Sequence, residues 1–115
     1  MNVEVKKPKI VKKPWGREIW IANEQEYAGK ILEIKRGFST SLHYHKEKKE
    51  TMYVLEGSAK IKFEKKDISL KEGQSIAINR SEMHKIIAIT DLKILEVSTP
   101  QLDDVVRVMD DYGRV

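Results

Sequence analysis

The residues of this sequence best suited to metal chemistry are its three histidines, His43, His45 and His84, together with Glu50. Because only one residue separates His43 from His45, both side chains would point to the same face of a β-strand. Glu50 follows a short charged loop, where a hairpin would return it to the histidine pair, and His84 begins a later apolar segment. Imidazole nitrogens with one carboxylate suit Zn, Mn, Fe, Ni or Co. The sequence therefore predicts one divalent metal ion held by these four side chains.

A lone histidine on a strand is more often an ordinary polar side chain than a metal ligand. Here, however, all the histidines of the chain fall on segments that can converge on one site if the sheet closes. The chain has no cysteine, which excludes disulfides and thiolate metal sites and makes a reducing cytoplasm the expected setting. The histidine pattern therefore favours the metal interpretation.

The segments that must position these residues alternate between apolar and polar side chains with the period of β-strands. Turn residues such as Gly37, Gly57 and Gly73 separate them. Nine short strands of this kind favour an all-β sandwich or barrel over βαβ units. The expected strands are 16–22, 28–35, 39–45, 51–55, 58–64, 68–70, 75–78, 83–89 and 92–97.

The length of 115 residues suits a single domain. We expect a basic N-terminal extension at 1–13, the β-barrel at 14–99, and a tail at 100–115 that packs on the barrel or on a partner subunit. Within the tail, 102–109 could form a helical turn or a strand. Four aspartates, at 103, 104, 110 and 111, are expected to be solvated or paired with basic side chains.

The positive charge of the chain is concentrated at its N-terminus. The net charge is +4, and the first thirteen residues alone contain five lysines and one glutamate. The remaining residues are therefore neutral in sum, which argues against a nucleic-acid-binding surface on the folded body. We expect the basic segment to be a solvated, frayed terminus. No apolar stretch approaches the roughly 18 residues of a membrane span, so no membrane association is expected.

Two spaced motifs resemble those of the cupin superfamily. The first consists of Gly37, five residues, His43, one residue, His45, four residues, Glu50, six residues and Gly57. The second is partly present as Gly73, five residues, Asn79, then Ser81 and His84. Asn79 and Ser81 stand where the family usually has Pro and Gly, which changes the turn but leaves the histidine in place. The resemblance implies a single-domain jelly-roll β-barrel with short N- and C-terminal extensions.

A narrower resemblance covers nearly the whole chain. It is carried by Lys-Pro-Trp-Gly at 13–16, Ala-Gly-Lys-Ile-Leu at 28–32, Glu-Val-Ser-Thr-Pro at 96–100, and the segments 102–107 and 110–114. In these segments the chain is similar to stand-alone cupins related to the C-terminal domain of type II mannose-6-phosphate isomerases. Bifunctional relatives join that domain to a sugar-nucleotide transferase. Because this sequence has neither such a domain nor a Gly-rich phosphate loop, nucleotidyl transfer is not expected.

The resemblance implies aldose–ketose isomerisation of a sugar phosphate, most specifically of mannose 6-phosphate and fructose 6-phosphate. A divalent ion would stabilise the negative charge of an enediolate, and a base must move a proton between C1 and C2. The candidates for that base are Glu50, His84 and Tyr53. The phosphate needs cations, for which the candidates are Lys30, Arg17, Arg107 and Arg114.

Two other functions use the same ligands. One is a non-catalytic, metal-containing cupin that binds a sugar, and the other is an iron-dependent cupin oxygenase. One fold hosts many functions, so the motifs alone do not separate these alternatives. We also expect a homodimer, because association can cover the exposed edges of the sheets, and the N-terminal strand is a candidate for exchange between subunits.

Overall fold

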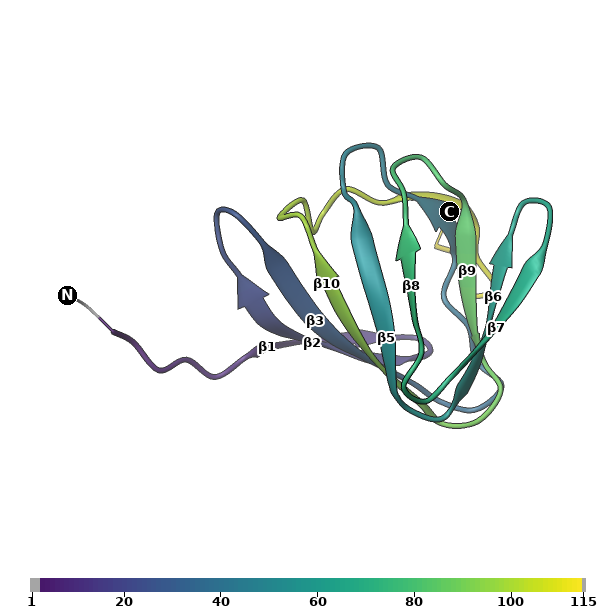
Figure 1. The fold of residues 1–115 in the computed structure, drawn as a ribbon, viewed down its shortest axis with the longest axis horizontal. Helices are drawn as coiled ribbons and strands as arrows, with labels where there is room; N and C mark the ends of the chain where they lie inside the picture. The colour runs from purple at the N-terminus through teal and green to yellow at the C-terminus, as the bar shows by residue number, and fades with distance from the viewer. Residues whose placement is uncertain (1–2, 115) are drawn as a thin grey trace.

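The computed structural model describes residues 3–114, which form eleven β-strands in two antiparallel sheets that face each other (Figure 1). The six-stranded sheet has the order β1 (Lys9–Lys13), β2 (Gly16–Asn23), β3 (Ala28–Ile34), β10 (Leu92–Ser98), β5 (Glu50–Glu56) and β8 (Ser75–Ile78). The five-stranded sheet has the order β11 (Val106–Met109), β4 (Leu42–Tyr44), β9 (His84–Ala88), β6 (Ser58–Phe63) and β7 (Asp67–Lys71). The predicted all-β class is confirmed. None of the described residues forms a helix long and apolar enough to cross a membrane.

Two strands lie outside the nine that the sequence predicts. β1 pairs with β2 from Lys9 opposite Trp20 to Lys13 opposite Gly16, so the end of the basic segment joins a sheet edge and is not frayed. β11 pairs with β4, which decides between the helical and extended alternatives in favour of a strand. Both segments contain β-branched residues, which fit a pleated surface.

The core lies between the two sheets, where alternate side chains of each strand point inward. Ile94 on β10, Val54 on β5 and Ile61 on β6 are completely buried. Trp15, in the turn between β1 and β2, belongs to the same cluster. The same inward face carries several charged residues near one end of the sandwich, and these residues build the site.

The connection from β4 to β5 does not form the predicted hairpin, and that prediction was wrong. β4 pairs with β9 and β11, whereas β5 pairs with β10 and β8, so the two strands belong to opposite sheets. The loop after His45 crosses from one sheet to the other. Glu50 therefore approaches the histidines from across the interior, so that four donor side chains surround one space instead of following one strand.

Candidate metal centre

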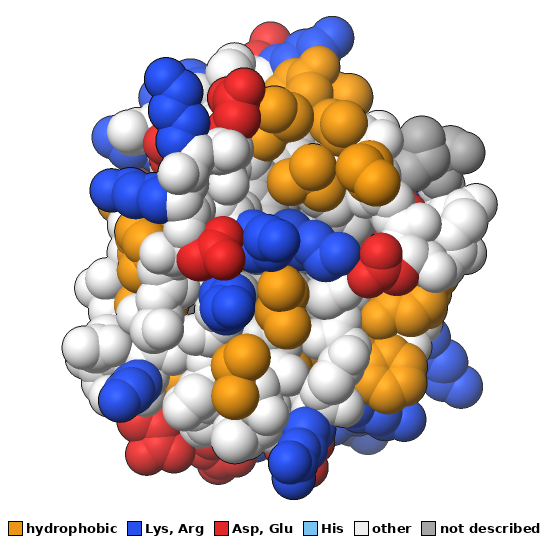
Figure 2. Space-filling model, turned by 90° about the vertical axis from the view of Figure 1, so that its right-hand side faces the viewer, with side chains coloured by type: hydrophobic (Ala, Val, Ile, Leu, Met, Phe, Trp, Pro, Cys, Tyr) orange, Lys and Arg blue, Asp and Glu red, His pale blue; other side chains and the backbone are white. Residues whose placement is uncertain are grey.

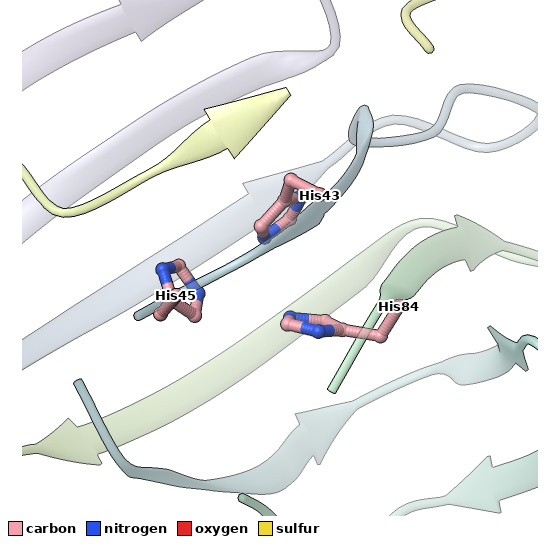
Figure 3. A group of neighbouring side chains, drawn as sticks. All are labelled: His43, His45 and His84. Carbon is pink, nitrogen blue, oxygen red and sulfur yellow. The ribbon is translucent and has the colours of Figure 1, made fainter. Parts of the chain in front are cut away.

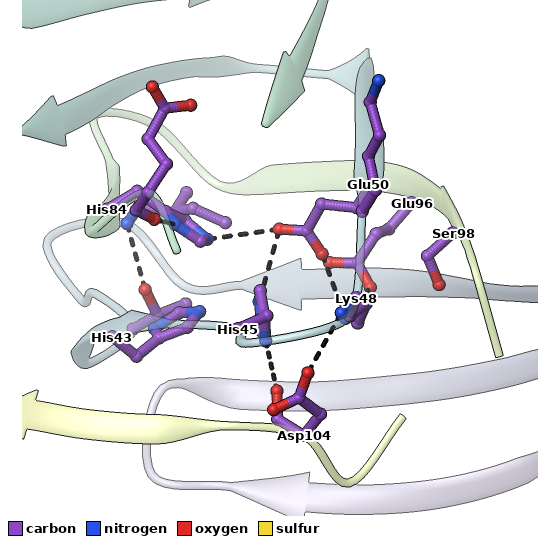
Figure 4. A network of polar contacts seen from close by, with 12 residues as sticks. His43, His45, Lys48, Glu50, His84, Glu96, Ser98 and Asp104 are labelled. Carbon is purple, nitrogen blue, oxygen red and sulfur yellow. Dashed lines mark hydrogen bonds and ion pairs between the residues drawn. The ribbon is translucent and has the colours of Figure 1, made fainter. Parts of the chain in front are cut away.

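Three strand ends bring the histidines together. His43 on β4 is the direct partner of His84, the first residue of β9, and His45 follows β4 immediately. One ring nitrogen from each histidine lies within 4.8 Å of the others (Figure 3). Glu50, the first residue of β5, places Oε1 at 3.2 Å from His84 Nε2 and 3.6 Å from His45 Nε2 (Figure 4). The three histidines thus form one cluster, Glu50 lies beside two of them, and all four predicted ligands line the same cavity.

Backbone carbonyls set the tautomer of each histidine. A carbonyl oxygen only accepts hydrogen bonds, so each Nδ1 must donate one, and in a neutral ring this leaves a lone pair on Nε2. The acceptors are Ser41 for His43 (2.8 Å), Glu82 for His84 (2.8 Å) and Asp104 for His45 (2.5 Å). This second contact is the one that orients histidines in metal sites.

In two of the three histidine rings, the nitrogen that faces the site has no hydrogen-bond partner among the described residues. His45 Nε2 and His84 Nε2 are buried and unpartnered. Both instead lie beside the carboxylate oxygen of Glu50, which also carries lone pairs. Buried lone pairs that converge without a proton between them repel one another, and a bound cation removes that repulsion. The residues therefore fit a metal ion with nitrogen and oxygen ligands.

Protonation states at neutral pH suit the same role. Burial, and then the neighbouring His84, lowers the pKa of His43 to about 3, so this ring is neutral. Although burial raises the pKa of Glu50, that pKa lies well below its ordinary value, and the Lys48 ammonium at 3.0 Å from Oε2 favours the carboxylate form. Neutral imidazole at His43 and a carboxylate at Glu50 are the forms that bind metal.

A buried lysine that the sequence pattern does not single out, Lys48, holds Glu50 in place. The Lys48 side chain is 1% exposed, and its ammonium lies 3.0 Å from Glu50 Oε2 and 3.0 Å from Glu96 Oε2. Burial lowers the pKa of Lys48, but the charges of Glu96 and Glu50 outweigh that effect. The net pKa is above its ordinary value, so the ammonium stays charged. Glu96 shares the inward face of β10 with Ile94. The alternation along this strand was the sequence feature that could have predicted an inward-facing Glu96. Within the charged run Lys46–Lys49, no sequence signal marks Lys48.

Asp104, in the C-terminal tail, holds the loop 46–49 that crosses between the sheets, a role beyond the solvated or ion-paired side chain that its sequence position predicts. Its carboxylate accepts hydrogen bonds from the backbone N–H groups of Lys46, Glu47 and Lys48 at 3.2, 2.6 and 3.0 Å. Its carbonyl oxygen accepts the hydrogen bond from His45 Nδ1. Burial raises the pKa of Asp104, but the three N–H donors lower it more. One residue thus positions both His45 and Lys48.

Replacing Asp104 by alanine is expected to lower the free energy of unfolding by about 2 kcal/mol, because three backbone donors lose a charged acceptor. Since folding lowers its pKa below the ordinary 3.8, this contribution is complete at neutral pH and is lost as the pH falls below that value. Urea unfolding at neutral and acidic pH measures both effects. Asp103→Ala, an exposed neighbour, is the matched control, and equal losses in the two variants would contradict the anchoring role.

Cations line the cavity next to the histidines. The cavity has a volume of about 60 Å³, and its walls include Lys13, Lys30, Arg107 and Arg114. Lys30 is buried, 3.2 Å from Glu18 and 3.9 Å from Glu96. Three of the four cations predicted to bind phosphate therefore lie at the site, and Lys13 is an addition. The only feature of the sequence that marks Lys13 is its position immediately before the Pro-Trp-Gly turn.

Two predicted site residues lie elsewhere. Arg17 is on the outer face of β2, paired with Glu33 on β3. Tyr53 is 40% exposed on the outer face of β5, between the buried Met52 and Val54. Strand alternation explains both positions, since Glu18 and Met52 occupy the inward face beside them. Neither Arg17 nor Tyr53 lines the cavity that contains the histidines.

Comparison with known proteins agrees with this architecture. Residues 2–110 match the family described as mannose-6-phosphate isomerase C-terminal. A mannose-1-phosphate guanylyltransferase of Escherichia coli (strain K12) is 31% identical over 110 residues, covering 91% of this chain and 23% of that protein. The chain thus spans about a quarter of the length of the curated relatives it matches.

Solved structures share the fold at low sequence identity. KdgF from Halomonas sp. superposes with a TM-score of 0.76 and 19% identity, over 84% of this chain and 91% of that one. A sugar phosphate isomerase of the cupin superfamily from Silicibacter pomeroyi gives a TM-score of 0.66 and 21% identity, over 72% and 58% of the two chains. With the two facing antiparallel sheets and the family match, these likenesses establish that the chain is a cupin jelly roll and belongs to the mannose-6-phosphate isomerase C-terminal family.

Proposed function

We propose that this chain is a metal-dependent sugar-phosphate isomerase that interconverts mannose 6-phosphate and fructose 6-phosphate. The observation that carries the proposal is that one cavity contains both the four metal donors and the cations that a phosphate needs. His43, His45, His84 and Glu50 would hold a Zn, Mn, Fe, Ni or Co ion, which supplies positive charge for enediolate oxygens. The family match supports the substrate class.

Two of the four cations at the site already have an ion-pair partner, and two do not. Lys30 is neutralised by Glu18 and Glu96, and Arg114 makes hydrogen bonds of 2.9 and 2.8 Å to Asp110. Arg107 and Lys13 form no ion pair within the described residues. We assign the first contact with phosphate to Arg107 and Lys13, since neither must break an existing ion pair.

The proton shuttle is assigned among the inward carboxylates and His84. Glu50 and His84 remain candidates because both reach the centre of the site, whereas Tyr53 faces outward. Glu96 joins them, since burial and the nearby Glu50 raise its pKa. A carboxyl group with a raised pKa is suited to taking and returning a proton near neutral pH.

The cavity constrains how a sugar phosphate enters. Its volume of about 60 Å³ is far below the roughly 300–1,000 Å³ of typical small-molecule pockets. Binding therefore requires the long side chains at its rim to move aside. Arg114 is the side chain best placed to do so, because it lies in the last described residues of the tail and its contacts are with the nearby Asp110 and Tyr112.

A coupled assay of mannose 6-phosphate conversion tests the proposal on protein stripped of metal and reloaded with each candidate ion. We expect turnover only with metal, and we expect Arg107→Gln to raise KM by at least about tenfold through loss of a charge-assisted contact. Arg36→Gln, an exposed arginine that does not line the cavity, should leave KM unchanged. Equal effects of the two variants on KM would show that Arg107 does not contact the phosphate.

The alternatives give different outcomes in the same preparation. Full loading with every metal and tight sugar-phosphate binding without turnover would indicate a non-catalytic, sugar-binding cupin. Oxygen uptake that depends on iron would indicate a cupin oxygenase. Either result would overturn the isomerase proposal.

A further inference from the structure

Glu18 is a buried carboxylate of the histidine cavity that belongs neither to the metal donors nor to the cations assigned to phosphate. It lies on the inward face of β2, opposite the buried Leu32 of β3, and its side chain is 11% exposed. It lines the same cavity as the histidines. Burying an acid costs free energy unless the acid is paired and hydrogen-bonded, so this position calls for an explanation.

The outer surface accommodates charge differently. On the side of the molecule where β6, β7 and β9 lie, basic and acidic side chains stand at the surface among hydrophobic groups (Figure 2). Lys60 and Asp67, for example, lie 3.9 Å apart with 46% and 42% of their side chains exposed. Exposed pairs of this kind need no ligand to explain them, because water solvates both charges.

Two donors hold the Glu18 carboxylate through one of its oxygens. Trp20 Nε1 and Lys30 Nζ both donate hydrogen bonds to Oε1, at 2.8 and 3.2 Å. Burial raises the pKa of Glu18, but the charge of Lys30, the hydrogen bond from Trp20 and the charge of Lys13 together lower it below its ordinary value. Glu18 is therefore an oriented carboxylate at neutral pH.

The second oxygen of Glu18 is free to bind a ligand. Among the described residues, Oε2 accepts no hydrogen bond, yet it is not enclosed as the unpartnered Nε2 atoms of His45 and His84 are. A carboxylate oxygen only accepts hydrogen bonds, so its partner must be a donor. Lys30 has three N–H donors and makes one hydrogen bond. A free acceptor beside free donors suits a hydroxyl group, which both donates and accepts.

A row of alternating charges that begins at the metal donor Glu50 ends at Glu18. Lys48 joins Glu50 to Glu96, with 3.0 Å to each (Figure 4). Lys30 then joins Glu96 to Glu18, at 3.9 and 3.2 Å. Glu18 thus lies on the wall of the cavity, beyond the metal donors.

The cations assigned to phosphate lie on the other side of Glu18. It faces Val11 on β1, and Lys13 follows two residues later on the same face of that strand. Lys13 and Arg107 both line the cavity. In a hexose 6-phosphate, C3 to C5 with their hydroxyl groups lie between the reacting carbons and the phosphate. A ligand that reaches from the metal donors to Lys13 and Arg107 therefore presents those hydroxyls to Glu18.

We propose that Glu18 is a specificity-determining residue, whose Oε2 accepts a hydrogen bond from the hydroxyl at C3 or C4 of the sugar phosphate. Lys30 beside it donates a hydrogen bond to the same part of the chain. Because a carboxylate and a phosphate repel each other, Glu18 also keeps the phosphate at Lys13 and Arg107. This assignment rests on the isomerase function proposed above.

A comparison of mannose 6-phosphate with its 3-deoxy and 4-deoxy analogues tests the contact on the metal-loaded full chain. The wild type should lose at least about tenfold in kcat/KM with one of the two analogues, because a hydrogen bond to a charged acceptor is missing. In Glu18→Leu this difference should shrink to less than about threefold, since neither compound then meets an acceptor. Glu18→Gln, whose amide oxygen is a neutral acceptor, should give an intermediate value.

Circular dichroism and bound metal report whether each variant folds. The matched control is Glu56→Leu, since that side chain is 68% exposed and does not line the cavity, and it should discriminate as the wild type does. If Glu18→Leu does not fold, Glu18→Gln decides alone, with a smaller discrimination than the wild type expected. A folded variant whose activity falls equally with all three compounds would overturn the proposal, because Glu18 would then have only a structural role.

Calorimetric binding of the same three compounds separates this proposal from the isomerase proposal. Binding without turnover, with a preference for mannose 6-phosphate that depends on Glu18, would refute the isomerase and support the hydroxyl contact. Turnover without such a preference would support the isomerase and refute the contact. A wild type that binds none of the three compounds would overturn both.

Discussion

Replacing His45 by alanine is expected to lower metal affinity by more than about 100-fold, since even residues that only orient a ligand contribute about 10–100-fold. The ring supplies one of three nitrogens that lie within 4.8 Å of one another, and its Nε2 is buried without a hydrogen-bond partner. Metal content after dialysis, measured by mass spectrometry, should fall from about one ion per chain to a small fraction.

Thermal unfolding provides the second measurement for this variant. Metal that binds only the folded chain stabilises it, by about 2.7 kcal/mol at a hundredfold excess over the Kd. Added metal should therefore raise the Tm of the wild type and leave that of His45→Ala unchanged. The control is Glu47→Ala, an exposed side chain on the crossing loop, which should behave as the wild type does. Undiminished metal in His45→Ala would refute the site.

Replacing Lys48 by methionine is expected to destabilise the metal-free protein by about 3–5 kcal/mol, because it leaves two buried carboxylates without their shared cation. Glu50 and Glu96 both contact the ammonium at 3.0 Å, and their side chains are 1% and 6% exposed. Methionine retains the length and apolar stem of lysine, so the loss reports on charge and not on packing volume. Denaturant unfolding with a chelator present measures it.

Two companion variants make the test of Lys48 specific. Lys49→Met changes the adjacent, exposed lysine and should alter stability by no more than about 0.5 kcal/mol. Adding Glu96→Gln to Lys48→Met removes one of the two facing carboxylates and should recover part of the loss. A Lys48→Met protein as stable as the wild type would show that the buried ion pairs contribute nothing to the fold.

The sequence by itself determined nine of the eleven described strands and which residues form the histidine cluster. The spacing of His43 and His45 places both rings on one face of any strand, because side chains alternate with a period of two. The same alternation along Ser58–Phe63 and Ala28–Ile34 separates buried from outward residues. Where a position depends on local periodicity, as for the inward-facing Lys30, the alternation along the strand was enough to predict the direction of the side chain.

Only the tertiary structure decided which sheet each strand joins and what surrounds each charge. β4 and β5 are neighbours in sequence but lie in opposite sheets, so Glu50 reaches the histidines across the interior. Lys48 and Lys49 are adjacent lysines, yet only Lys48 is buried. Its ammonium pairs with Glu96, and its backbone N–H donates a hydrogen bond to Asp104. Such burial depends on contacts between segments that are about fifty residues apart. Local periodicity contains no information about those contacts, because packing between distant strands fixes them.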